Sequence, residues 1–335
     1  MKIIRFKLLK FFKRRIKTTI SLGFLLWIFI HYFTQYSQEQ VPGWESNISR
    51  DINLYINPEN NTLILSPKFP CISSYLLIIV HSAVANAKAR TAVRNTWANK
   101  QNIYFKYFKS VNKTIEVAFI LGKSKNKTLN NKILDENSRY GDIIQEDFID
   151  TYNNLTIKSM MMLKWAIAKC PRATFIMKTD DDIYINIPVL MRALRTSNTT
   201  RLLMGHILID PLRITDPGNK WYVPDYMFWE RTYPNFTAGS GYIMSSDVGL
   251  ILYKTALTTP LIHMEDVYLT GICAQKANLS HTTYPNFEYW HPPFLLKFLY
   301  TEPRNYITVH CENIFEMYKI WNELNTVLHS PREEK

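Results

Sequence analysis

The chain has 335 residues, of which 47% are hydrophobic and 14% aromatic, and its formal net charge is +12 at pH 7. This length and apolar content can build a sizeable core, so the composition excludes a largely disordered protein. Eight of the positive charges lie within residues 2–17, where no acidic residue occurs. The remainder is only mildly basic and has no basic stripe with interleaved aromatic residues, so we do not expect nucleic-acid binding.

A membrane segment is predicted directly after the basic run. Residues 20–30 are almost entirely apolar, and residues 18–34 contain no Asp, Glu, Lys or Arg. The stretch is shorter than the ~20 apolar residues of a comfortable span, which leaves a cleaved signal peptide or a short signal anchor. No small-residue cleavage site follows, which favours the anchor. The positive flank predicts a cytosolic tail over residues 1–17 and a luminal remainder.

Glycosylation signals and cysteines are consistent with a luminal location. Eight Asn-x-Ser/Thr sequences occur, at Asn47, Asn60, Asn112, Asn126, Asn154, Asn198, Asn235 and Asn278. The four cysteines are Cys71, Cys170, Cys273 and Cys311. They form no C-x-x-C pair, so a zinc cluster is not expected. In an oxidising compartment they could form two disulfides, and the spacing leaves all three connectivities open.

Strands alternate with helices after a polar segment. Residues 35–70 are polar and contain four prolines, which predicts a luminal stem before a catalytic domain over residues 71–335. Strands are expected over 74–80, 116–121, 142–145 and 174–178, and helices over 83–97, 127–140 and 157–169. The alternation predicts an α/β fold in which helices cover both faces of a mostly parallel sheet.

The strongest chemical signal is a run of three carboxylates, Asp180, Asp181 and Asp182, between two apolar segments. These acids repel one another and resist leaving water, while the apolar flanks favour burial. A divalent cation would neutralise them, because Mn²⁺ and Mg²⁺ prefer carboxylate oxygens together with phosphate oxygens of a ligand. The run follows a predicted strand, where open α/β sheets bind ligands. The alternative is a solvated acidic turn, which the apolar flanks disfavour.

A second acidic pair and two arginines are weaker candidates. Glu265 and Asp266 precede an apolar stretch, and a carboxylate near a bound donor could act as general base on an acceptor hydroxyl. On spacing alone, acids that suit a helix N-terminus explain the pair better. Arg90 and Arg94 share one face of a predicted helix. They could pair with a pyrophosphate or form a solvated face, and spacing does not choose.

Two glycines and a histidine complete the candidates. Gly239 and Gly241 would let the backbone approach a ligand closely, or would simply make a turn. His310 ends a predicted strand and is a possible third metal ligand, although a lone histidine there is usually structural.

Six motifs in register resemble the beta-1,3-glycosyltransferase family, which includes beta-1,3-galactosyltransferases and beta-1,3-N-acetylglucosaminyltransferases. They are Arg90–Trp97, Lys178–Asn186, Lys220–Val223, Tyr233–Tyr242, Glu265–Tyr268, and Ile307–His310 with Glu316–Met317 and Ile320–Trp321. The match covers roughly residues 71–325. The resemblance implies a type II Golgi membrane protein with a GT-A-like fold that uses a UDP-sugar and Mn²⁺, or Mg²⁺, and inverts the anomeric centre.

The resemblance also implies roles for individual residues. Asp180 and Asp182 would bind the nucleotide and the metal, with Asp181 beside them and His310 as a further metal ligand. Asp266 would be the catalytic base. The residues implied at the UDP moiety are Arg90 and Arg94, and those implied near the sugar or the acceptor are Trp221, Gly239, Gly241 and Glu265.

The implied reaction moves a hexose, with galactose preferred, from a UDP-sugar to a glycan hydroxyl on a glycoprotein or glycolipid. UDP-N-acetylglucosamine and UDP-N-acetylgalactosamine are alternative donors. A catalytically silent luminal chaperone or lectin on the same fold is an alternative of another class, against which the retained acids argue. A glycoside hydrolase also uses paired carboxylates, but it needs no metal at a diphosphate.

The sequence departs from the family pattern at several positions. Thr237 stands where many members have cysteine, and Thr301 lies near the place of a second expected cysteine. Gly271 comes one residue later than expected, and Ile314 and Phe315 replace a usual Pro-Glu. These changes affect the acceptor side more than the metal side.

Overall fold

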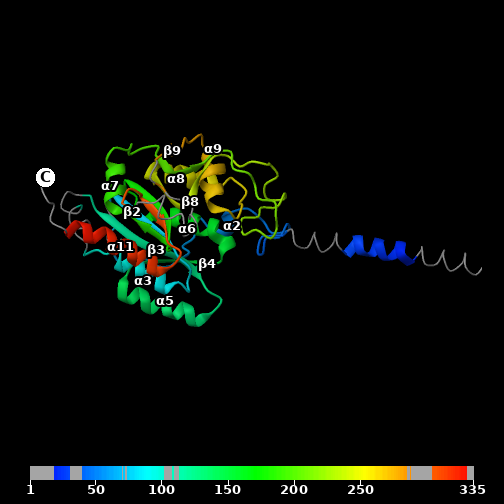
Figure 1. Cartoon of the computed structure of the whole chain (residues 1–335), viewed down its shortest axis with the longest axis horizontal. Coiled ribbons are helices and arrows are strands. Elements are labelled where there is room, and N and C mark those ends of the chain that lie inside the picture. Colours follow the sequence, from blue (N-terminus) through cyan, green and yellow to red (C-terminus); the bar gives the residue numbers. More distant parts are fainter. Residues whose placement is uncertain are drawn as a thin grey trace, which may run out of the picture. The chain divides into compact units, whose positions relative to one another are not determined.

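The computed structural model describes residues 19–30, 40–69, 71, 74–101, 108, 113–284, 287 and 304–329. The chain divides into two compact units. The smaller comprises Met1–Ile48 and Ile214–Trp229, and the larger comprises Ser49–Arg213 and Glu230–Lys335. The larger unit holds every predicted site residue except Trp221. Figure 1 labels its strands and helices.

A sheet in the order β1-β4-β3-β2-β5-β8-β7-β9 forms the centre of the larger unit. Its strands are β1 (Leu63–Leu65), β2 (Leu76–His81), β3 (Ile115–Lys123), β4 (Ile143–Ile149), β5 (Phe175–Asp180), β7 (Leu203–Leu208), β8 (Phe236–Ser245) and β9 (Thr282–Thr283). The central strands β4, β3, β2 and β5 run parallel, and β8 is antiparallel to β5. Their carboxyl ends therefore meet at one edge. The prediction of a mostly parallel sheet is confirmed.

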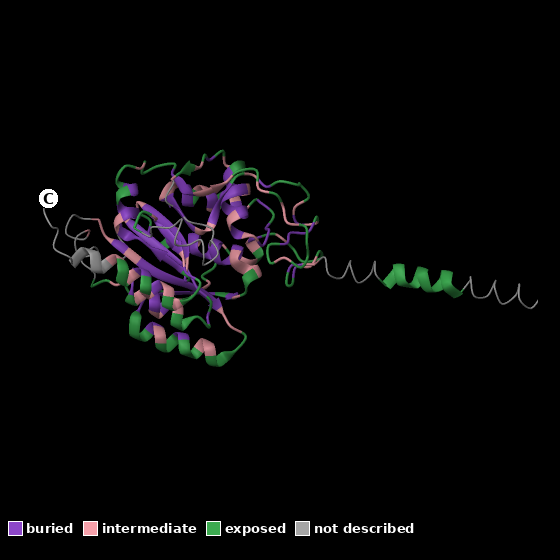
Figure 2. Cartoon of the chain, in the orientation of Figure 1, coloured by how far each residue is buried: buried purple, intermediate pink, exposed green. Residues whose placement is uncertain are grey.

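Helices cover both faces of this sheet. They are α2 (Asn53–Ile56), α3 (Ala87–Asn95), α5 (Lys127–Tyr140), α6 (Leu155–Lys169), α7 (Ile187–Arg195), α8 (Ser246–Ala256), α9 (Ala274–Lys276) and α11 (Ile314–His329), with the short helices η1 (Tyr152–Asn154) and η2 (Val267–Cys273). One face of β2 packs in a core with side chains of α3, α5, α7 and α11. The opposite face packs against α6 and α8, where Gly249 lies beside Ile176 and Leu163. Figure 2 shows the central strands buried.

Helix α5 begins and ends where the sequence predicts. The Asn126 side chain accepts a hydrogen bond from the Thr128 amide at 2.9 Å, which caps the first turn. Gly141 ends the helix with a φ of +62°, a conformation that glycine adopts without steric cost.

The folded part starts earlier than predicted. Within the predicted stem, β1 pairs antiparallel with β4 at the sheet edge. The Lys164 ammonium of α6 donates to the carbonyls of Ile56, Asn57 and Asn60 at 2.7 to 2.8 Å, which fixes the segment that leads into β1. The segment from Ser49 to Arg213 therefore belongs to the larger unit.

One disulfide joins Cys71, before β2, to Cys170, after α6, with 4.9 Å between their Cα atoms. Cys273 and Cys311 are buried thiols. The structure therefore joins Cys71 to Cys170, a pairing that belongs to one of the three possible connectivities. The second disulfide of that connectivity, between Cys273 and Cys311, is not formed.

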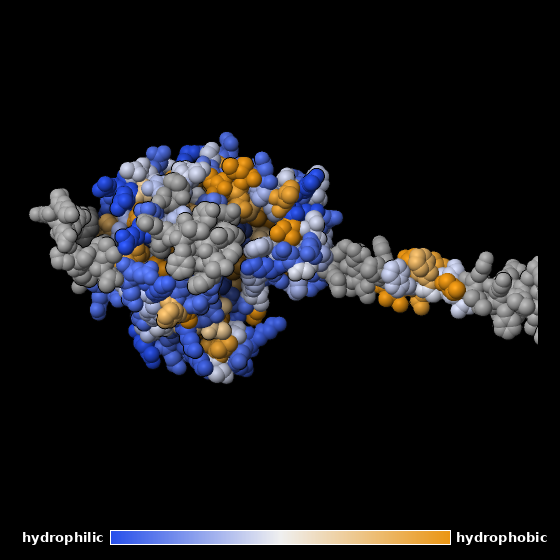
Figure 3. All heavy atoms as spheres, viewed as in Figure 1, coloured by the Kyte–Doolittle hydropathy of each residue, from blue (hydrophilic) through white to orange (hydrophobic). Residues whose placement is uncertain are grey.

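Residues 19–30 form a helix with exposed apolar side chains, among them Ile20 at 67% and Trp27 at 59% exposure (Figure 3). Across the described residues, no helix has both the length and the apolar character needed to span a membrane. Residues 1–18 and 31–34 of the predicted tail and anchor lie outside the described residues, and the anchor stays a prediction.

In the smaller unit, a tyrosine side chain joins the two chain segments. The Tyr226 hydroxyl donates to the Trp44 carbonyl at 2.6 Å and accepts from the Val41 amide at 3.2 Å. Trp221 of this unit is 44% exposed, and the Lys220 ammonium lies 4.5 Å from the centre of its ring. Its predicted role near the sugar or acceptor stays a prediction.

Candidate active site

The acidic run forms a turn at the carboxyl end of β5. It leads into β6 (Ile183–Ile185), which pairs antiparallel with β10 (Thr308–His310). His310 pairs with Ile183, and the Cys311 amide donates to the Asp182 carbonyl at 2.8 Å. The His310 Nε2 atom consequently lies 3.4 Å from Asp182 Oδ2. Two residues far apart in sequence, both predicted as metal ligands, are thus neighbours.

The outer two acids of the run have different environments. Burial, reinforced by the charge of Asp182, raises the pKa of Asp180 to about 7 despite the nearby Lys178 ammonium. Burial also opposes ionisation of Asp182, but the hydrogen bond and charge of His310 outweigh it and lower the pKa of that carboxyl. At neutral pH, Asp182 is therefore ionised to a greater extent than Asp180.

Protein side chains alone do not complete a metal site here. Within the described part of the chain, no group of three or more His, Cys, Asp or Glu side chains is placed to hold a metal ion. Asp182 and His310 nevertheless offer a carboxylate oxygen and an imidazole nitrogen, which Mn²⁺ accepts. Nucleotide-dependent sites usually add phosphate oxygens and water to one or two carboxylates. The residues present fit a metal that is held jointly with a diphosphate.

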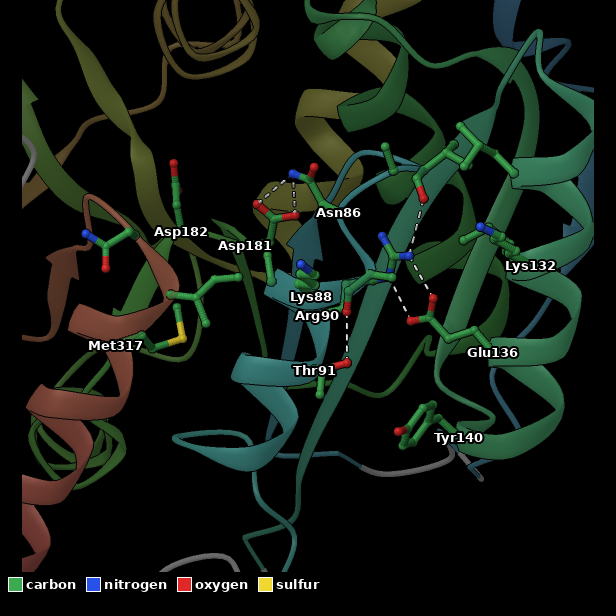
Figure 4. A pocket seen from close by; sticks show the side chains of 18 of the residues that line it. Asn86, Lys88, Arg90, Thr91, Lys132, Glu136, Tyr140, Asp181, Asp182 and Met317 are labelled. Carbon is green, nitrogen blue, oxygen red and sulfur yellow. Dashed lines mark hydrogen bonds and ion pairs between the residues drawn. The ribbon is translucent and has the colours of Figure 1, made fainter.

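Asp181 connects the acidic turn to the loop after β2. Its carboxylate accepts from the Ser82 hydroxyl at 2.6 Å and from the Asn86 side-chain amide at 3.1 Å (Figure 4). Only 9% of Asp181 is exposed. These bonds fix the turn against the start of α3.

A cavity of about 790 Å³ opens beside this turn. Its lining comes from the start of α3, from α5, from Asp181 and Asp182, and from His310 to Met317. The volume lies within the range of small-molecule sites, roughly 300 to 1,000 Å³. Its basic lining residues are Lys88, Arg90, Lys132 and Arg139, and its acidic ones are Asp135, Glu136, Asp181, Asp182 and Glu312. Lys88 and Lys132 are labelled in Figure 4, and the first turn of α3 contains no acidic residue. Lysine ammonium groups and the N–H groups of a helix N-terminus suit an anionic ligand.

The two arginines are engaged by carboxylates. Arg90 is fully buried, and its guanidinium donates to Glu136 at 2.8 and 2.7 Å and to the Ser82 hydroxyl at 2.9 Å. Arg94 donates to Asp142 and Glu136 at 2.8 Å, and Arg90 but not Arg94 lines the cavity. The arginines hold α3 against α5 and the strand edge. Direct contacts between either guanidinium and UDP stay predictions.

A second cluster surrounds Lys178, whose side chain points to the opposite face of β5 from the main core. The Lys178 ammonium lies 2.9 Å from Asp180 Oδ1, 2.9 Å from Glu265 Oε1 and 2.6 Å from the Gly239 carbonyl oxygen. Burial opposes its charge, but Asp180 and Glu265 outweigh burial and raise the pKa of Lys178. A charged lysine therefore joins the acidic turn to the second acidic pair.

Asp266 lies at the start of η2, beside this lysine cluster. Its carboxylate accepts from the Gly239 amide at 3.1 Å and from the Val267 amide at 2.9 Å. Burial and then the charge of Glu265 raise the pKa of Asp266 to about 6. A carboxylate with a pKa near the working pH is well suited to general-base catalysis.

Glu265 faces the interior. It is 5% exposed, and its Oε2 atom accepts from the Ser159 hydroxyl at 2.9 Å and the Tyr242 hydroxyl at 3.1 Å. These contacts identify a buried support for Asp266. A contact between Glu265 and substrate stays a prediction.

Gly239 and Gly241 lie inside β8 and not in a turn. A Cβ atom on Gly239 would lie 3.1 Å from Asp266 Oδ2 and 3.3 Å from Glu265 Oε1. On Gly241 it would lie 2.8 Å from Cγ2 of Thr308. Because Gly239 has no side chain, the carboxylates of Glu265 and Asp266 can lie close to β8. Because Gly241 has none, β10, which carries His310, can pack closely against β8.

Two residues of this region were missed by the sequence reasoning. Lys178 stands two positions before Asp180 on one strand, so both side chains share a face, and that spacing could have revealed it. His81 pairs in register with Asp180, is 3% exposed, and has no hydrogen-bond partner for either ring nitrogen among the described residues. Burial, together with Lys178 and Lys158, lowers its pKa well below the usual value. Nothing in the local sequence marks His81.

The larger unit therefore combines a mostly parallel sheet with an acidic turn, a cavity of about 790 Å³ and a second carboxylate pair, and the comparisons with known proteins assign this arrangement to the glycosyltransferases. The family model described as Galactosyltransferase matches residues 88–285. The chain is 35% identical over 279 residues to Beta-1,3-galactosyltransferase 1 of Mus musculus, covering 82% of each chain. It is 33% identical over 250 residues to Beta-1,3-galactosyltransferase 5 of Gorilla gorilla gorilla, covering 74% of this chain and 78% of that one.

This chain belongs to the galactosyltransferase family. The predicted resemblance and the predicted hexosyltransferase class are confirmed. Among solved structures, it is similar to the WbbM bifunctional glycosyltransferase with a TM-score of 0.40 and 13% identity, covering 74% of this chain and 47% of that one.

Proposed function

We propose that this chain transfers galactose from UDP-galactose to a glycan hydroxyl on a glycoprotein or glycolipid, in a beta-1,3 linkage and with inversion at the anomeric carbon. The observation that carries the proposal is the contact of Lys178 with Asp180 on one side and with Glu265, the neighbour of Asp266, on the other. It brings a candidate donor site next to a candidate base. The 35% identity to a beta-1,3-galactosyltransferase supports the choice of sugar and linkage.

In this proposal the cavity beside the acidic turn binds the nucleotide. Lys88, Lys132 and the N-terminus of α3 would bind the diphosphate, and Asp182 and His310 would hold Mn²⁺ together with oxygens of the diphosphate. The metal, when bound, would stabilise the negative charge of the leaving UDP. Asp181 and Arg90 keep the loop after β2 in place through Ser82. The protein thereby presents positive charge where the transition state gains negative charge.

Asp266 is the proposed base of a single in-line displacement. Its carboxylate takes the proton of the acceptor hydroxyl while that oxygen forms a bond to C1 of the sugar and the bond from C1 to the diphosphate oxygen breaks. The Gly239 and Val267 amides orient the carboxylate through hydrogen bonds of 3.1 and 2.9 Å. General-base assistance contributes about 10² to 10⁴ in rate.

We further propose a single-pass type II protein of the Golgi membrane. The basic residues 2–17 followed by the uncharged residues 18–34 support this orientation. Protease protection of the catalytic unit in sealed vesicles checks it, since cleavage without detergent would place that unit on the cytosolic side.

A donor screen tests the proposed activity. Full-length protein in detergent is incubated with UDP-galactose, UDP-N-acetylglucosamine or UDP-N-acetylgalactosamine, a panel of oligosaccharide acceptors, and either Mn²⁺ or a chelator. We expect acceptor-dependent UDP release with UDP-galactose and its loss with chelator. Preference for another UDP-sugar would correct the donor, and absence of turnover with every donor would contradict the function.

A further inference from the structure

We propose that Lys178 is a positioning residue that sets the distance between the donor site and the catalytic base. The proposal rests on the proposed function above. Lys178 is 2% exposed, and its ammonium has three acceptors within 2.9 Å: Asp180, Glu265 and the Gly239 carbonyl. An ammonium group has three donors, so this geometry uses all of them and leaves the group no freedom to turn.

Each of the three acceptors lies on a different element of the site. Asp180 ends β5 and precedes the acidic turn, Glu265 precedes η2, and Gly239 lies in β8. Lys178 therefore ties together the elements that carry the proposed metal ligand, the proposed base and the strand between them. Two of the three acceptors, Glu265 and Gly239, are distant from Lys178 in sequence, so no local turn could replace these contacts.

The lysine also permits the two acidic groups to approach each other. Asp180 and Glu265 would repel in a buried site without a cation between them. Glu265 immediately precedes Asp266, and Gly239 contributes its carbonyl to Lys178 and its amide to Asp266. Asp266 is thus positioned by Glu265, the residue before it, and by Gly239, which donates a hydrogen bond to it. Both of these residues contact the Lys178 ammonium.

A merely structural lysine would behave differently, and the chain offers one for comparison. The Lys164 ammonium of α6 has four acceptors, Ile56, Asn57, Asn60 and Thr62, none of which belongs to the proposed active site. Loss of Lys164 should lower thermal stability without changing the turnover of folded molecules. Loss of Lys178 should change the turnover itself, because misplacing reacting groups by about 1 Å can cost ~10²-fold in rate.

The experiment compares full-length wild-type protein with two variants. In the first, Lys178→Met is combined with Glu265→Gln, so that the net charge of the buried cluster is the same as in the wild type. The second is Lys164→Met. Calorimetric titration with UDP in the presence of Mn²⁺ counts the folded sites and gives Kd, and galactose transfer then gives kcat per UDP-binding site. Thermal unfolding is recorded for each protein.

We expect kcat per site of the Lys178 double variant to fall about 100-fold while its Kd for UDP changes by less than about threefold. The Lys164 variant should keep both values and lose only thermal stability. A folded double variant whose kcat stays within about threefold of wild type would overturn the proposal. So would a parallel loss of UDP affinity and kcat, since Lys178 would then serve donor binding alone.

Lys178→Arg decides the case if the double variant binds no UDP. Arginine keeps the charge, but its planar fork cannot place donors on three converging oxygens as an ammonium does. We expect a folded variant with UDP affinity retained and kcat lowered at least about tenfold. Unchanged kcat would reject the positioning role. Absence of turnover in the wild type itself would instead reject the proposed function and not the role of Lys178 within it.

Discussion

The environment of Asp266 gives a direct test of its chemistry. Asp266→Asn preserves the shape of the side chain and removes the base, so transfer should fall by about 10² to 10⁴. Binding of UDP with Mn²⁺, measured by calorimetry, should be nearly unchanged, because Asp266 lies outside the cavity lining. Asp147→Asn, at a half-exposed surface residue of β4, serves as control. Retained turnover in a radiolabelled-sugar assay would remove Asp266 from its proposed role.

The same carboxyl group should set the acidic limb of the pH profile. Its pKa is raised to about 6, so the proportion of ionised base falls as the pH drops through that value. We expect kcat/KM for the acceptor, at saturating donor and Mn²⁺, to decline below pH 6 with a slope of one proton. An acidic limb near pH 4 would instead indicate a base whose pKa is not raised by burial and by the charge of Glu265.

At the residue scale, the sequence predicted the position of the acidic run but not its contacts. Three adjacent carboxylates between apolar segments predicted a site, because such charges are unfavourable in a core without a partner, and the structure places them at the carboxyl end of β5. The spacing of Lys178 and Asp180 on one strand could have indicated that they share a face, but not that Glu265 and Gly239 would also contact the lysine. The spacing of Arg90 and Arg94 indicated a shared helix face but not that Glu136 would face both of them.

At the scale of elements, the ion pair between α3 and α5 should matter for stability. Arg90 is fully buried against Glu136, whose side chain is 11% exposed. Glu136→Gln would leave a buried guanidinium without its counter-charge, which destabilises by about 3 kcal/mol. Urea unfolding checks this against Glu323→Gln, which removes an exposed pair with Lys319 and should cost less than about 0.5 kcal/mol. Equal effects of the two substitutions would contradict the assigned importance of the buried pair.

The packing of β10 on β8 gives a second test at this scale. Gly241→Ala would place a methyl group 2.8 Å from Thr308 Cγ2, which displaces the strand that carries His310. Loss of support around a metal ligand typically costs about 10- to 100-fold in metal affinity. We expect that loss in calorimetric titrations of Mn²⁺ with UDP. Thr308→Ser, which removes the obstructing methyl group, should restore much of the affinity in the double variant, and failure to restore it would argue against this steric cause.

Elements with strong local signals were predicted well, and those defined by distant partners were not. Helix α5 has a capping asparagine and a terminal glycine in the sequence itself. Strand β1 has three residues in a polar segment, and only its pairing with β4 makes it a strand. The contact between Asp182 and His310 likewise depends on β6 and β10 pairing across more than a hundred residues, which no spacing rule encodes.

For the whole molecule, the segment predicted as a stem is partly folded. Val41 and Trp44 contact Tyr226 in the smaller unit, and β1 pairs with β4 in the larger one. Residues 35–39 of the predicted stem lie outside the described residues.

The proposed anchor leads to a prediction about acceptors. Full-length protein reconstituted in vesicles should glycosylate an oligosaccharide on a lipid faster than the same oligosaccharide free in solution, because an anchored enzyme and the lipid would share the bilayer surface. Insertion of a 20-residue Gly-Ser linker after residue 37 should reduce that preference, and transfer to the two acceptors at each linker length measures it. A preference that does not respond to the linker would count against this effect of the anchor.

Strand β1 limits how far the chain can be shortened from its N-terminus. A soluble fragment that begins at Cys71 would lack β1 and expose the edge of β4 to pairing with other molecules. A soluble fragment that keeps this edge covered must therefore begin before Leu63.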